Sequence, residues 1–150
     1  MTLRQKILRR LVNFYPPFMG AGIKIRFSKD NRRIFVSMPL KWFNRNYVNV
    51  HFGGSLYMMC DPFFMLLLMD ALGDDYIVWD KSAAIEFVKP GKSTVFAEFY
   101  INNQKIEEIR RELEHRDKIY PEFLVNVIDK DGQVIAKVRK VIYVRKKNRA

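Results

Sequence analysis

The most constraining feature of this 150-residue chain is a long apolar segment near its middle. Residues 55–73 read SLYMMCDPFFMLLLMDALG, in which Asp61 and Asp70 are the only charged side chains. The segment is too long for one strand, and Gly73 is a suitable residue for a helix C-terminus. A helix that is apolar on nearly every face must be enclosed on nearly every side. The sequence therefore predicts a central helix from Ser55 to Leu72 that is wrapped by a sheet.

A membrane span is the other structure that encloses an apolar helix. Asp61, Pro62 and Asp70 interrupt this segment, and the unbroken apolar stretch between them, residues 63–69, is only seven residues long. A transmembrane helix needs about 20. We therefore interpret the segment as a core helix.

The rest of the chain carries strand patterns separated by turns. Residues 129–132 (DKDG), between two apolar runs, are typical of a hairpin turn. Predicted strands cover residues 23–28, 33–38, 76–79, 82–88, 94–101, 120–128 and 134–144, and a charged helix covers residues 104–116. This order predicts one α+β domain over residues 1–150, with an antiparallel sheet. Because a single layer leaves edge strands uncovered, we expect a homo-oligomer, either a dimer or a tetramer.

An amphipathic helix is predicted over residues 1–15. Leu3, Ile7 and Leu11 recur at helical spacing among basic residues, and Pro16-Pro17 is expected to end the helix. We prefer packing of this helix on its own domain, with contact to a membrane surface as the alternative. The protein core is then expected over residues 20–146.

Charge is distributed unevenly along the chain. Residues 1–45 hold eleven Lys and Arg residues and one acid, and residues 132–150 hold seven basic residues and no acid, whereas the middle is net acidic. Basic ends around an acidic middle favour a polyanionic ligand or surface. The chain shows no motif of a known nucleic-acid-binding class, so we predict no nucleic-acid partner.

Cysteine and histidine are scarce. Cys60 is the only cysteine, which excludes an intramolecular disulfide and a zinc site built on paired thiolates. With only His51 and His115, we predict no metal. The start Met-Thr-Leu-Arg lacks the apolar region of a secretory signal, so we expect a cytoplasmic protein.

The region from Asn46 to Gly73 resembles the hotdog-fold acyl-CoA thioesterases of the phenylacetate-pathway type. That family carries an Asn, a loop, a His-Gly-Gly sequence and an acidic residue seven positions after the second glycine. Here Asn46 lies eight residues before Gly54, and Asp61 lies seven residues after it. The turn Phe87-Val88-Lys89-Pro90-Gly91 and the hairpin 131–136 (DGQVIA) also resemble the family, and the segment HFGGSLYMMCDPFFMLL is most similar to a tetrameric acyl-CoA thioesterase-like branch.

The resemblance implies a hotdog fold and roles for particular residues. Catalytic roles fall to Asp61, Gly54, Asn46 and His51, and contacts with the substrate fall to Gly53 and Phe52. The sequence departs from the pattern at one position, because Phe52 occupies the place of the family's His and His51 lies one residue earlier.

Asp61 has two interpretations. A carboxylate among apolar residues must be paired, hydrated or functional, and thioester hydrolysis needs a nucleophile or a base that activates water. Alternatively, Asp61-Pro62 is a favourable start for a helix, with the Asp as a simple cap. The resemblance favours the functional interpretation, in which Pro62 lies inside the helix and kinks it. A nucleophilic role for Cys60 is less favoured, because the neighbouring residues supply no base.

The predicted function is hydrolysis of acyl-CoA thioesters. The first N–H groups of a helix opening at Gly53-Gly54 suit a developing oxyanion, and no cofactor is expected beyond the coenzyme A of the substrate. Lys89, Lys92 and Arg139 are candidates for holding its phosphates. The alternative is a non-catalytic hotdog protein that binds acyl-CoA or a fatty acyl group.

Overall fold

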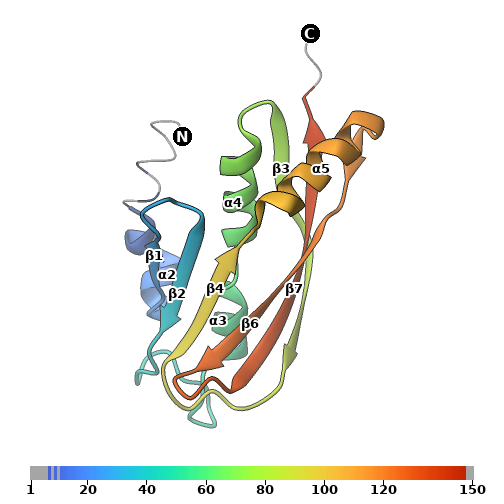
Figure 1. Ribbon diagram of the computed structural model, residues 1–150. Helices are drawn as coiled ribbons and strands as arrows, with labels where there is room; N and C mark the ends of the chain where they lie inside the picture. The colour runs from blue at the N-terminus through green and yellow to red at the C-terminus, as the bar shows by residue number, and fades with distance from the viewer. Residues whose placement is uncertain (1–6, 8, 10, 148–150) are drawn as a thin grey trace.

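The computed structural model describes residues 7, 9 and 11–147, and it contains a seven-stranded antiparallel sheet curved around two helices (Figure 1). The strands are β1 (Lys24–Phe27), β2 (Arg33–Met38), β3 (Tyr76–Phe87), β4 (Val95–Tyr100), β5 (Lys118–Ile119), β6 (Glu122–Asp129) and β7 (Val134–Lys146). Their order is β1-β2-β4-β6-β7-β3, and the short β5 also pairs with β7. The α+β class and the antiparallel sheet around a central helix are thereby confirmed.

Two predicted strands are one strand in the structure. Residues 76–79 and 82–88 were expected to be separate, but β3 runs through both and pairs with β7 along its length. The polar residues between them cause only a shift of register between Asp80 and Ser82. A bulge accommodates an extra residue without ending the strand.

The central helix is divided into α3 (Gly53–Met58) and α4 (Phe63–Leu72). The backbone N–H groups of Cys60 and Asp61 donate to carbonyls three residues earlier, at 2.8 and 3.2 Å, and the Asp61–Pro62 peptide bond is cis. Both expectations for the helix geometry at Asp61-Pro62 were wrong. Pro62 does not lie inside a kinked helix, and Asp61 does not cap α4, because Pro62 occupies the cap position and no side chain accepts a bond there.

The segment from Gly53 to Leu72 is long and apolar enough by composition to cross a membrane, and half of its most apolar window is buried in this protein. Met59 and Cys60, in the turn between the helices, are fully buried. Burial of the turn as well as of α4 explains why the sequence is apolar through the break.

Strands β4 and β6 meet over a very short ladder. Their register contains only two pairs, Val95 with Asp129 and Phe96 with Ile128, and beyond these pairs the strands diverge (Figure 1). The ring of Phe64, from α4, lies 5.1 Å from the ring of Phe99 on β4 and 4.9 Å from that of Phe123 on β6. Aromatic side chains thus join the two parts of the sheet where backbone hydrogen bonds do not.

The N-terminal prediction is only partly described. Residues 1–6, 8 and 10 of the expected amphipathic helix lie outside the described residues. Pro16-Pro17 was expected to stop a helix, but it begins one: α2 (Pro16–Ala21) follows the 3₁₀ turn η1 (Val12–Phe14). Proline fits the first position of a helix, where its missing N–H would have had no partner.

Helix α5 (Asn103–His115) confirms the predicted charged helix. Its cap is Asn102, whose side-chain oxygen accepts the backbone N–H of Lys105 at 2.7 Å. Ile109 and Leu113 are buried, so the apolar side of α5 packs on the body of the protein.

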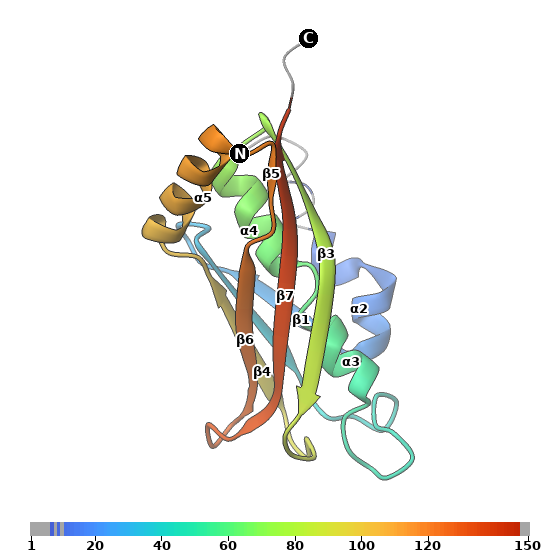
Figure 2. The ribbon, with the colours of Figure 1, turned by 90° about the vertical axis from the view of Figure 1, so that its right-hand side faces the viewer.

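Strand β3 forms one edge of the sheet (Figure 2). Cross-strand partners share a face of a sheet, so Ala83 and Phe87 face the same side as their β7 partners, Lys140 and Ala136. Both β7 residues are buried, yet Ala83 is exposed and Phe87 is 57% exposed. The half of β3 that ends at Phe87 is thus less covered on its inner side than the half that holds buried Val78.

Candidate active site

A pocket of about 390 Å³ lies between the loop before α3 and the loop after β3. Four residues predicted from the sequence line it: Asn46, His51, Gly53 and Lys89. The other lining residues are Val50, Leu56, Phe87, Val88, Pro90 and Gly91. The structure therefore brings together residues from two loops that are 40 positions apart.

Asn46 organises the first of these loops. Its side-chain oxygen accepts the backbone N–H groups of Val48 and Val50, at 3.0 and 3.2 Å, and its own N–H donates to the carbonyl of Val50. A side chain that closes a turn in this way fixes the path of the backbone. In the single chain, the oxygen of Asn46 is engaged in holding the loop.

His51 connects the two loops. It is 2% exposed, its backbone N–H donates to the carbonyl of Gly91 at 2.9 Å, and its Nε2 lies 2.8 Å from the carbonyl oxygen of Ser93. Because a carbonyl only accepts, Nε2 carries the proton. Nδ1 is buried and has no hydrogen-bond partner among the described residues. The ring is thus an anchor between loops in this structure.

Burial lowers the pKa of His51 below its ordinary value, and the bond to Ser93 offsets only part of that effect. The unfolded chain therefore binds a proton at a higher pH than the folded one, so stability is retained above about pH 6.5 and lost as the pH falls. We expect His51→Gln to flatten this acid dependence of the melting temperature relative to the wild type. His115→Gln, which changes an exposed histidine, is the matched control, and parallel curves for wild type and His51→Gln would contradict the prediction.

Gly53 and Gly54 open α3, and their surroundings leave no room for a side chain. A Cβ on Gly53 would lie 2.9 Å from the ring of Phe87, and one on Gly54 would lie 2.5 Å from the ring of Phe52. The N–H groups of Ser55 and Leu56 already donate to the carbonyl of Phe52. The two glycines thus precede the first intrahelical bonds, and aromatic rings pack directly on their backbone.

Asp61 is not among the residues that line this pocket; it belongs to a second group at the other end of α3. Its Oδ1 accepts a hydrogen bond from Nζ of Lys140, and the same ammonium lies 2.9 Å from Oδ1 of Asp80. The hydroxyl of Tyr57 is 3.3 Å from Nζ. The Lys140 side chain is 1% exposed, whereas 40% of the Asp61 side chain is exposed. We call Tyr57, Asp61, Asp80 and Lys140 the lysine cluster.

Charge pairing governs the protonation of the lysine cluster. Burial by itself would lower the pKa of Lys140, but the bonds to Asp61 and Asp80 reverse this, and the pKa lies above its ordinary value. Burial raises the pKa of Asp80, and the nearby ammonium opposes that rise. Burial also raises the pKa of the Cys60 thiol, to about 12, so Cys60 stays protonated and does not serve as a nucleophile at neutral pH.

Lys140 and Asp80 were missed by the sequence analysis, although a signal for Lys140 was present. In β7, the buried residues Ala136, Val138, Ile142 and Val144 occupy alternate positions, and Lys140 is in phase with them. A lysine on the apolar face of a strand must find a buried counter-charge. The sequence signal for Asp80 is weaker. Asp80 lies beside the register shift of an edge strand, where the alternation of buried and exposed residues is interrupted.

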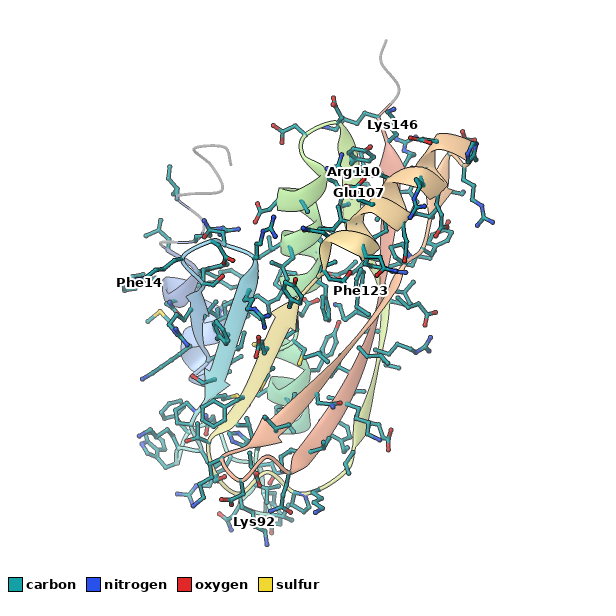
Figure 3. All side chains as sticks on the ribbon, viewed as in Figure 1. Phe14, Lys92, Glu107, Arg110, Phe123 and Lys146 are labelled. Carbon is teal, nitrogen blue, oxygen red and sulfur yellow. The ribbon has the colours of Figure 1, made fainter. Side chains whose placement is uncertain are left out.

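The predicted phosphate-binding residues are separated in space. Lys89 lines the pocket, and its Nζ donates to Oε1 of Gln133 at 2.8 Å. Lys92 lies in the same loop, between β3 and β4, and is exposed at the lower end of the molecule in Figure 3. Arg139 is exposed on β7 and pairs with Glu122 at 3.3 Å. Strand alternation points it to the face opposite that of buried Lys140, so it does not join the pocket.

The chain was compared with family models, with curated proteins and with solved structures. The model of the family described as "Domain of unknown function (DUF4442)" matches residues 4–144. A search of curated proteins found no match.

Among the described residues, no group of three His, Cys, Asp or Glu side chains is arranged to hold a metal.

Solved structures resemble the whole chain. One is a protein of unknown function from Pseudomonas aeruginosa, described as a probable thioesterase, with a TM-score of 0.81, 18% identity, and coverage of 98% of this chain and 99% of that chain. A protein of unknown function from Chlorobaculum tepidum has a TM-score of 0.71 and 16% identity, covering 96% and 95%. A thioesterase from Haemophilus influenzae has a TM-score of 0.68 and 14% identity, covering 99% and 95%. At these identities the likeness shows the fold.

Proposed function

We propose that this chain, which belongs to the DUF4442 family, hydrolyses acyl-CoA thioesters to a free acid and coenzyme A. The observation that carries the proposal is the arrangement along α3. A pair of glycines with closely packed backbone opens the helix, and a partly exposed carboxylate, Asp61, is held just beyond its end. The folds of the thioesterases from other organisms support the same reaction class.

The chemistry divides between these two ends. Asp61 would remove a proton from water or attack the thioester carbonyl, and the N–H groups at the start of α3, Gly54 among them, would stabilise the oxyanion that forms. When Asp61 acts on water, the proton that it takes passes to the departing sulfur, and coenzyme A leaves as the thiol. When Asp61 attacks, the thiolate leaves as an anhydride with Asp61 forms, and water then hydrolyses that anhydride to the free acid. In this proposal, Asn46 and His51 hold the loop that brings Gly53 and Phe52 to the substrate.

One chain does not bring both groups to one carbonyl. The six residues of α3 alone rise by about 9 Å, whereas reacting groups must lie about 3 Å from the atoms they act on. We therefore propose that the active form is a homodimer in which the glycines of one copy meet Asp61 of the other. A tetramer would be formed by two such dimers.

Strand β3 is the proposed dimer contact. Its outer edge is unpaired within the described residues, and it contributes Phe87 to the pocket and Asp80 to the lysine cluster. Two copies related by a twofold axis would pair antiparallel along this edge. With the axis near Ala83 and Ala84, the Phe87 end of one strand lies beside the Asp80 end of the other. The pocket of one copy then faces the lysine cluster of its partner.

The direct test is a thiol-release assay with purified protein and short-chain, aromatic and long-chain acyl-CoA thioesters. We expect turnover on at least one class. Binding with no turnover of any of the three classes would instead support the alternative, a non-catalytic acyl-CoA-binding protein. The ion pair that engages Asp61 with Lys140 is the observation that favours this alternative.

Coenzyme A is expected to bind through Lys89, at the mouth of the pocket. Lys89→Met should weaken the binding of free coenzyme A by roughly two- to fivefold, which is the change in affinity expected from the loss of one exposed ion pair. The same change should reduce the dependence of the affinity on salt concentration. Calorimetry at two salt concentrations measures both effects. Lys105→Met, the same change on α5, is the control, and equal affinities for wild type and Lys89→Met would remove Lys89 from the site.

A further inference from the structure

We propose that Lys140 is a positioning residue for the reaction: it holds the Asp61 carboxylate in place without touching the substrate. This inference rests on the proposed function, in which Asp61 acts on the thioester. It concerns a residue from β7 that lies 79 positions from Asp61 in the chain.

Burial excludes direct contact of Lys140 with the substrate. Its side chain is 1% exposed, and its neighbours across the sheet are Ala83 on β3 and Phe123 on β6. The side chain extends from the middle of three paired strands toward the turn between α3 and α4. The Asp61 side chain, by contrast, is 40% exposed, so it is accessible while one of its oxygens is held.

Three side-chain oxygens surround the ammonium of Lys140. Nζ donates to one oxygen of Asp61 and to the hydroxyl of Tyr57, and one oxygen of Asp80 lies 2.9 Å away as an ion-pair partner. The ammonium also lies 5.3 Å from the centre of the Tyr57 ring, over its face. A cation fixed from three directions defines one position for each oxygen around it. Lys140 is therefore suited to orienting Asp61 and unsuited to donating a proton to a leaving group.

The roles of the two carboxylates differ. Asp80 is the less exposed of the two, at 25%, and lies on the strand next to β7, so it fixes the ammonium from the side of the sheet. Asp61 lies in the turn between α3 and α4, and its more exposed side chain is held by Lys140. The ammonium joins this turn to the sheet, and loss of the cation would free Asp61 to leave its reactive position.

A double-mutant cycle tests the inference. Lys140→Met, Asp61→Asn and the variant with both changes are assayed for kcat and KM on the best substrate. We expect Lys140→Met to lower kcat by about 10²-fold, as misplacement of a reacting group by about 1 Å does, with little change in KM. In the Asp61→Asn background, Lys140→Met should have no further effect on kcat. A purely structural role would not produce this loss of effect.

Folding and charge need separate controls. Lys140→Met leaves two carboxylates without their cation, so Lys140→Met/Asp80→Asn, which removes one charge of each sign, is measured beside it and should show the same loss of kcat in a folded protein. Lys105→Met is the control for an unrelated lysine. An unchanged kcat in the folded variants, or a loss that multiplies with that of Asp61→Asn, would overturn the role of Lys140 alone. Inactive wild type on every acyl-CoA would overturn the proposed function and this role with it.

Discussion

Asp61→Asn is expected to lower turnover of acyl-CoA thioesters by roughly 10²–10⁴-fold, the usual contribution of a positioned acid–base group. The amide keeps the shape of the side chain but lacks the charge and the basic lone pair. Because the amide oxygen of Asn can still accept from Lys140, the lysine cluster should keep its arrangement and the protein should fold. Steady-state kinetics and a melting curve on the same preparation measure the effect.

Asp70→Asn is the matched control. Asp70 is the other carboxylate of the apolar segment. It lies near the C-terminal end of α4, away from the lysine cluster, and it forms an ion pair with Arg9. It should retain near wild-type turnover once any difference in stability is accounted for. A folded Asp61→Asn protein with wild-type turnover would show that the carboxylate serves the structure alone and would favour the binding function.

Phe87→Ala is expected to weaken the homodimer by about 30-fold or more, the effect of losing an aromatic hot spot worth about 2 kcal/mol. Phe87 is 57% exposed on the inner side of the edge strand, and its ring packs on the backbone of Gly53. Removing the ring should therefore affect both the proposed interface and the adjoining pocket. Sedimentation velocity over a range of protein concentrations measures the dissociation constant.

The same substitution at Phe14 provides the comparison. Phe14 is 68% exposed on η1, and Figure 3 shows it on the side of the molecule away from β3. Phe14→Ala should leave the association unchanged. A wild-type protein that stays monomeric at micromolar concentration would remove the dimer, and with it the account of how Gly54 and Asp61 reach one substrate.

The fold was predictable because its strongest signal, a long apolar segment interrupted by Asp61, Pro62 and Asp70, favours a core helix over a membrane span. Residues 55–73 are apolar on nearly every helical face, so burial required that other elements surround the helix. The division into α3 and α4 was not predictable in this way, because an apolar turn and an apolar helix bury similar side chains. Pro16-Pro17 misled for a related reason, since the same two residues stop a helix that precedes them and start one that follows.

The grouping of residues at the candidate pocket was predictable where it depends on short-range patterns. Asn46, His51 and Gly53 lie within eight residues of one another, and the pocket brings Lys89 to them through a turn that the sequence marks with Pro90-Gly91. The pairing of Asp61 with Lys140 depends on how far β7 extends past α3, which is a tertiary property. The only sequence signal was the position of Lys140 among the buried residues of β7. That position predicted a buried counter-charge but did not identify which carboxylate supplies it.

The short ladder between β4 and β6 has implications for how the sheet holds together. Strands β1, β2 and β4 form one hydrogen-bonded panel, and β6, β7, β3 and β5 form another, with two residue pairs as the link between them. Separating the panels beyond these two pairs would break no backbone hydrogen bond, so the buried rings of Phe64, Phe99 and Phe123 supply most of the resistance to opening there. The cohesion of the sheet at this point therefore depends on side-chain packing, whereas a fully paired sheet would depend on its backbone ladder.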